Sequence, residues 1–140
     1  MPVADFLLDT SALARASLAP VEGVLLPLLT RGRLAQCGMT SLEALFSARN
    51  PTDHRRLRAA FDREYEWLPT EDVDFRRALE VQAALAERGQ HRAVPLPDLI
   101  IAAVAERHRV TVLHYDADYD LVADVTGQAV RWIVPRGSVD

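Results

Sequence analysis

The sequence contains no lysine and only one cysteine, and each scarcity excludes whole classes of function. All 16 basic residues are arginine. P-loop nucleotide-binding sites and Schiff-base enzymes both depend on a lysine side chain, so this chain can build neither. The lone Cys37 excludes an internal disulfide and a cysteine-based zinc cluster. Because it stands in a mostly apolar run, we expect Cys37 in the core.

Long apolar runs are also absent. No run approaches the roughly 20 residues that span a bilayer, so no membrane association is expected. The first residues lack the positive charges that begin a signal peptide, and with the single cysteine this favours a cytoplasmic protein. The length of 140 residues predicts a single domain over residues 1–140. With a net charge of −4, the chain is no general binder of polyanions, although its arginines can contact phosphates locally.

Short apolar runs alternate with longer helix-like stretches along the chain. The short runs predict strands at residues 6–8, 33–39, 67–69, 110–115 and 130–134. The stretches between them predict helices at residues 11–17, 19–32, 40–49, 53–66, 70–89, 98–108 and 119–125. This alternation is typical of an α/β fold with a mainly parallel sheet. The strongly apolar stretch 21–29 fits either the core or a partner surface.

Four acidic residues share one type of position in the predicted fold. Asp9 and Asp116 each end an apolar strand. Glu43 stands in the first turn of the helix after the second strand, and Asp98 begins an apolar helix. In a parallel sheet, the carboxyl ends of the strands and the amino ends of the following helices lie at one edge. We therefore expect the four carboxylates to converge there, with Asp118 close behind them.

Converging carboxylates indicate a particular chemistry. Several of them within about 5 Å repel one another strongly, and a bound cation relieves that repulsion. Hard oxygen ligands select Mg²⁺ or Mn²⁺, which activate water for attack on a phosphodiester. Helix amino ends at the same edge favour anions such as phosphate. We expect the hydroxyl of Ser11 beside the metal or the phosphate.

Each acid also has a purely structural interpretation. Asp9, Asp98 and Asp118 are good N-caps for the helices that follow them. Glu43 fits the last position of a capping box that begins three residues earlier. The sequence excludes two other kinds of metal site. The acids that begin at Asp116 resemble the start of a calcium loop, but the glycine and the glutamate that such a loop needs are missing. The four histidines likewise show no zinc-ligand spacing.

Four motifs occur in order along nearly the whole chain. They are LLDTSAL at 7–13, TSLE at 40–43, PDLIIAAVA at 97–105 and VLHYDADYD at 112–120. With them the chain resembles a PIN-domain ribonuclease, and in particular the VapC-type toxins of bacterial toxin–antitoxin pairs. The resemblance implies a three-layer α/β/α sandwich around a mainly parallel sheet. It also implies endonuclease activity on RNA that depends on Mg²⁺ or Mn²⁺.

The same resemblance assigns roles to individual residues. The family's catalytic acidic quartet matches Asp9, Glu43, Asp98 and Asp116. Asp9 and Asp98 would contact the metal directly and Asp116 directly or through water, whereas Glu43 would orient a water or a second ion. Asp118 matches an additional acid, and Ser11 matches a small hydroxyl near the first acid. The family further implies a homodimer and a cognate antitoxin whose tail enters the acidic groove.

A cluster of basic residues adds a candidate RNA contact. We expect four arginines to hold the RNA backbone, the alternative being a solvated helix face: Arg49, Arg55, Arg56 and Arg58. Two other functions stay open. One is a PIN-like nuclease acting on DNA or structured nucleic acid outside a toxin pair. The other is a non-catalytic α/β binding module whose acids are only helix caps.

Overall fold

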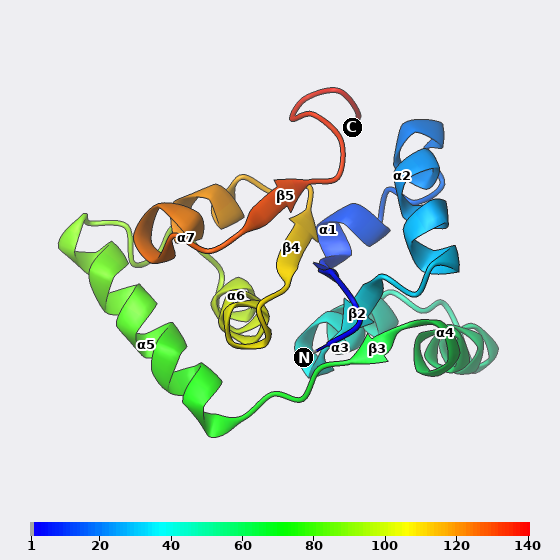
Figure 1. Ribbon diagram of the computed structural model, residues 1–140, viewed down its shortest axis with the longest axis horizontal. Helices are drawn as coiled ribbons and strands as arrows, with labels where there is room; N and C mark the ends of the chain where they lie inside the picture. The colour runs from blue at the N-terminus through cyan, green and yellow to red at the C-terminus, as the bar shows by residue number, and fades with distance from the viewer. Residues whose placement is uncertain (1) are drawn as a thin grey trace.

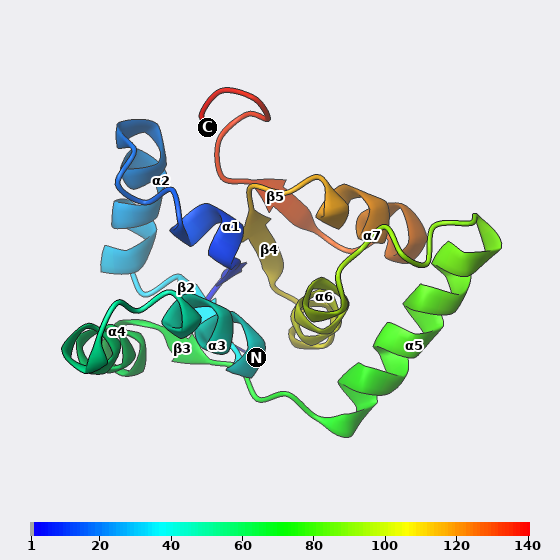
Figure 2. The same ribbon diagram turned by 180° about the vertical axis from the view of Figure 1, so that it is seen from behind.

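A five-stranded parallel sheet forms the centre of the computed structural model, which describes residues 2–140 (Figures 1 and 2). The strand order is β3-β2-β1-β4-β5, with each strand parallel to its neighbours. The strands are β1 (Phe6–Leu8), β2 (Leu34–Gln36), β3 (Glu66–Trp67), β4 (Thr111–His114) and β5 (Val130–Trp132). Because β1 is the central strand, its carboxyl end lies in the middle of the sheet edge.

Seven helices connect the strands within residues 2–140. They are α1 (Thr10–Leu13), α2 (Ala19–Thr30), α3 (Gly38–Phe46), α4 (Pro51–Glu64), α5 (Asp72–Glu87), α6 (Leu96–His108) and α7 (Asp118–Thr126). None of these described helices has the length and apolarity that crossing a bilayer requires.

The sheet is covered on both faces, as the alternation of its side chains requires. Leu7 packs into the cluster that includes residues of α5, α6 and α7, whereas Phe6 and Leu8 pack into the one that includes α1 and α2. Figure 1 accordingly shows α5, α6 and α7 on one side of the strands and α2 and α4 on the other. The predicted three-layer α/β/α sandwich with a mainly parallel sheet is confirmed.

Most predicted elements are present, with shifted ends. The second strand stops at Gln36, three residues early, because Cys37 already turns the chain into α3. Cys37 is fully buried, as expected. The apolar stretch 21–29 forms most of α2, where Val21 and Leu25 are buried but Leu26 is 56% exposed. The core interpretation therefore holds for one side of this helix only.

Candidate metal centre

Acidic side chains from four parts of the chain meet at the carboxyl edge of the sheet. Carboxylate oxygens of Asp9, Glu43 and Asp98 lie within 4.8 Å of one another. A second group with the same spacing contains Asp98, Asp116 and Asp118. The structure thus brings together the predicted quartet and the additional acid. Asp98 belongs to both groups and is the centre of the cluster.

Asp9 is held rigidly at the end of β1. Its Oδ2 accepts hydrogen bonds from the backbone N–H of Ser11 (3.0 Å) and from the Ser11 hydroxyl (2.6 Å). Its Oδ1 accepts from the hydroxyl of Tyr119 at 2.7 Å, and Asp9 is only 4% exposed. The capping interpretation is therefore correct too, since Asp9 is the N-cap of α1. One carboxylate both caps this short helix and faces the other acids.

The hydroxyl of Ser11 ties two strand ends together. It donates to Asp9 and accepts from the backbone N–H of Tyr115, at 2.9 Å, just beyond β4. It therefore lies beside the acids as expected, but both of its hydrogen bonds go to the protein. What Ser11 does in this structure is orient Asp9.

Glu43 does not belong to a capping box. The N-cap of α3 is Cys37, and the hydroxyl of Thr40 accepts from the Cys37 N–H at 2.9 Å. The helix begins earlier than predicted, so Glu43 lies in its second turn, where no backbone donor is unpaired. Burial and then the charge of Asp9 raise the pKa of Glu43. Its side chain is thereby available to the acidic cluster.

Asp98 is not an N-cap either. Pro95 is the N-cap of α6, and Asp98 is the third residue of the helix, where its own N–H bonds to the Pro95 carbonyl at 3.0 Å. Burial, and then the negative charges of the surrounding acids, raise the pKa of Asp98 to about 8. Among residues 2–140, no donor lies within hydrogen-bond distance of its carboxyl to counter this. Without a cation, Asp98 carries a proton at neutral pH.

The two acids after β4 form a small turn over a buried histidine. The backbone N–H of Asp118 donates to Asp116 Oδ1 at 2.9 Å, and Asp118 is the first residue of α7. The predicted N-cap role of Asp118 is therefore wrong, because Ala117 occupies that position. The N–H of Asp116 donates to Nδ1 of His114 at 3.1 Å. Burial lowers the pKa of His114, which keeps the ring neutral and able to accept this bond.

Sequence reasoning missed Tyr119. This residue is fully buried, and its hydroxyl donates to Asp9 Oδ1 at 2.7 Å. Its position among Asp116, Asp118 and Asp120 was the available signal, but a pattern cannot say into which layer one aromatic ring points. The donor set as a whole consists of carboxylate oxygens, crowded enough to require a positive charge. These residues fit a hard divalent ion such as Mg²⁺ or Mn²⁺.

The four arginines expected to contact RNA lie on α4 and the turn before it: Arg49, Arg55, Arg56 and Arg58. Arg49 and Arg56 form ion pairs with Asp53 at 3.5 and 2.6 Å. Arg58 forms one with Asp62 at 3.8 Å. All four are exposed. This surface suits a solvated helix face as well as an RNA backbone, so contact with RNA stays a prediction.

The metal-free protein is expected to lose stability as the pH rises from about 6.5 to 8. Burial and the neighbouring acids raise the pKa of Asp98 in the folded chain from the usual 3.8 of an aspartate to about 8. In this window the folded chain binds a proton that the unfolded chain has lost, so the free energy of unfolding falls with pH. A difference of one bound proton lowers the free energy of unfolding by at most about 1.4 kcal/mol for each pH unit. His114, whose pKa is lowered, opposes this trend only below about pH 6.5.

Urea unfolding in EDTA across that window measures the slope. Saturating Mn²⁺ should weaken the decline, because the ion replaces the proton at the cluster. A free energy of unfolding that is constant or rises between these pH values in EDTA would contradict the assignment of a protonated Asp98.

The sequence matches proteins of one family over most of its length. The pattern of the family described as PIN domain matches residues 6–125. Ribonuclease VapC21 of Mycobacterium tuberculosis is 48% identical over 133 residues, which cover 95% of this chain and 96% of that protein. Ribonuclease VapC51 of the same organism is 45% identical over 135 residues, covering 96% and 97%.

Solved structures share the fold. DNA-bound VapBC from Salmonella typhimurium matches with a TM-score of 0.72 at 17% identity, covering 94% of this chain and 99% of that one. VapBC-5 from Mycobacterium tuberculosis, a member of a family of toxin–antitoxin systems, matches with a TM-score of 0.58 at 29% identity, covering 93% and 97%. The arrangement of helices around a parallel sheet is therefore common to this chain and to these proteins.

Proposed function

Because the chain belongs to the PIN-domain family of VapC ribonucleases, we propose that it is an endoribonuclease that uses Mg²⁺ or Mn²⁺ and acts as the toxin of a toxin–antitoxin pair. The observation that carries this proposal is the pair of acidic groups that share Asp98. Two sets of carboxylate oxygens overlap at Asp98, whose carboxyl is protonated in the absence of metal. This arrangement suits one divalent ion or a closely spaced pair of ions.

The acids have different roles in this proposal. Asp9 and Asp98 would hold the ion directly, Asp116 would do so directly or through water, and Asp118 would support that side of the cluster. A bound ion would supply activation of water and neutralise charge on the phosphate. Ser11 keeps Asp9 fixed through its two hydrogen bonds. Oxygen ligands held in place before the ion arrives lose little entropy on binding it.

The proposed reaction is hydrolysis of a phosphodiester. The oxygen of a water molecule bonds to phosphorus while the bond from phosphorus to the 3′-oxygen breaks, which leaves a 5′-phosphate and a 3′-hydroxyl. The water gives one proton to a carboxylate of the cluster, and the leaving oxygen takes one from solvent. Glu43, half-buried at the rim, orients the water by accepting its hydrogen bond. No side-chain nucleophile is needed.

Two protein partners belong to the proposal. A cognate antitoxin is supported by the fold shared with VapBC proteins. A homodimer is supported by an apolar cavity of about 350 Å³ on α5 and α6. Around it Phe75, Leu79 and Leu96 are 50%, 66% and 65% exposed, and exposed apolar patches of this kind mark protein interfaces. A cytoplasmic location belongs to the same proposal.

Cleavage assays with end-labelled RNA and DNA of identical sequence test the function. We expect cleavage of the RNA alone, with Mg²⁺ or Mn²⁺, loss of cleavage in EDTA, and products that carry a 5′-phosphate. Comparable cleavage of the DNA would instead favour a nuclease outside a toxin pair. Failure to cut either polymer, together with no Mn²⁺ binding in calorimetry, would favour a non-catalytic binding module.

A further inference from the structure

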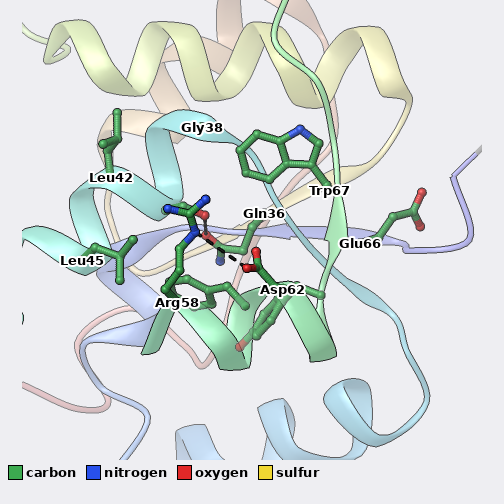
Figure 3. A pocket seen from close by; sticks show the side chains of 11 residues that line it. Gln36, Gly38, Leu42, Leu45, Arg58, Asp62, Glu66 and Trp67 are labelled. Carbon is green, nitrogen blue, oxygen red and sulfur yellow. Dashed lines mark hydrogen bonds and ion pairs between the residues drawn. The ribbon is translucent and has the colours of Figure 1, made fainter. Parts of the chain in front are cut away.

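A cavity between α3, α4 and β3 takes no part in the chemistry proposed above. It has a volume of about 380 Å³ and is shown from close by in Figure 3. Rings of Phe61, Tyr65 and Trp67 contribute to its wall, and Arg58 and Asp62 of α4 bring charge to it. Trp67 is 58% exposed. A large aromatic ring left partly in water at the wall of a cavity is a ready platform for a ligand.

The cavity lies at the same sheet edge as the acids. Trp67 is the last residue of β3 and pairs with Gln36, the last residue of β2. Since neighbouring strands lie about 4.8 Å apart, β3 is roughly 10 Å from β1, whose end carries Asp9. Leu42 lines both this cavity and the hollow next to Glu43. A nucleic-acid strand that passes the acids can therefore reach the cavity by crossing one side chain.

The groups in the cavity suit the edge of a nucleobase. Figure 3 shows Trp67 next to Gly38, with Arg58 and Asp62 reaching the cavity from α4. The guanidinium donates hydrogen bonds and the carboxylate accepts them, and base edges present both acceptors and donors. Arg58 and Asp62 are 64% and 68% exposed and 3.8 Å apart, so their weak ion pair is easily exchanged for a ligand.

The surroundings favour a polyanion. Exposed Arg55 lies three residues before Arg58 on the same helix face, where it can meet a phosphate next to a bound base. Glu66 also lines the cavity, but its Oε1 accepts from the N–H groups of Val3 and Ala4 and its side chain points away from Arg58 and Asp62 (Figure 3).

We propose that this cavity binds an unpaired nucleobase of the RNA substrate, stacked on Trp67, and so helps to select where the RNA is cut. The inference rests on the proposed ribonuclease function and names a subsite of it. A stacked base strengthens binding about fivefold to a hundredfold. Because the base lies beside the acids rather than among them, the subsite changes RNA affinity and not affinity for the metal.

Binding of single-stranded RNA to protein carrying Asp98→Asn tests the proposal without cleavage. In that background, Trp67→Ala should weaken RNA binding about tenfold, whereas Trp67→Phe, which keeps an aromatic platform, should stay within about threefold. Mn²⁺ affinity measured on the single Trp67→Ala variant should be unchanged. Trp67 is already more than half exposed, so its truncation should leave the unfolding midpoint nearly unaltered.

An abasic nucleotide moved stepwise along the RNA locates the base. At one position the abasic nucleotide should weaken binding about tenfold to the Asp98→Asn protein that keeps Trp67. It should have no further effect on the protein that also carries Trp67→Ala, since the two changes remove the same contact.

Equal affinities of the proteins with and without Trp67→Ala for every RNA would overturn the inference. Unchanged RNA binding with loss of inhibition by the co-expressed antitoxin would also overturn it, in favour of a protein-docking surface. If RNA binds through Trp67 but is never cut by the unaltered chain, the proposed catalysis and the selection of a cleavage site fail, and only the binding of a base at Trp67 stands.

Discussion

Asp98→Asn is expected to abolish metal-dependent cleavage and at the same time to stabilise the metal-free protein. Asp98 belongs to both acidic groups, so its loss would remove a candidate ligand from each. Metal catalysis supplies several kcal/mol of transition-state stabilisation, and its loss lowers the rate on the order of a thousandfold. Asparagine has nearly the same shape and no charge. It therefore removes the repulsion and the burial cost that raise the pKa of Asp98.

Opposite changes in activity and stability distinguish a functional acid from a structural one. Cleavage rates with saturating Mn²⁺ and urea unfolding in EDTA at about pH 8 give the two quantities. Asp124→Asn removes one negative charge from an exposed position of α7 and should change neither. Retained cleavage in Asp98→Asn would remove Asp98 from the metal centre. Lost cleavage with a lower free energy of unfolding would mean that Asp98 serves the fold.

Tyr119→Phe is expected to weaken Mn²⁺ binding about tenfold to a hundredfold while leaving the fold intact. The change deletes one oxygen, the donor of the 2.7 Å hydrogen bond to Asp9 Oδ1. Asp9 would then be held only through Ser11, on its other oxygen, and its carboxylate could rotate. Groups that hydrogen-bond a metal ligand typically contribute this much to affinity because they fix its orientation. The turnover number at saturating Mn²⁺ should fall less than the affinity.

A second tyrosine offers a matched control. The hydroxyl of Tyr115 donates to the Val139 carbonyl at 2.6 Å and accepts from the N–H of Gly137, so it binds the C-terminal segment and no acid. Tyr115→Phe also loses a tyrosine hydroxyl but should keep full Mn²⁺ affinity in calorimetry. Equal affinities of Tyr119→Phe and the unaltered chain would show that the Tyr119 hydroxyl does not prepare Asp9 for the ion.

The pattern around Glu43 shows where prediction from sequence stops. Thr40 followed three residues later by Glu43 is the sequence of a capping box, but α3 begins at Gly38, so the match is fortuitous. The alternative N-cap interpretations of Asp98 and Asp118 fail in the same way, because both residues lie inside their helices. Helix ends are decided by which backbone donors lack partners in the folded chain, and a short sequence pattern carries little of that information.

The chain order of strands, helices and acids was enough to predict an α/β fold with a mainly parallel sheet and the meeting of the acids, whereas the three-layer arrangement was implied by the family resemblance. Parallel strands with helical crossovers bring strand ends to one edge whatever the loops do, so Asp9, Asp98 and Asp116 had to approach one another there. Only the tertiary structure decided how they meet. Tyr119 reaches Asp9 across 110 positions of sequence, and Asp98 holds a proton because packing leaves it buried among like charges. Such contacts depend on which side chains the layers press together, and no local pattern encodes them.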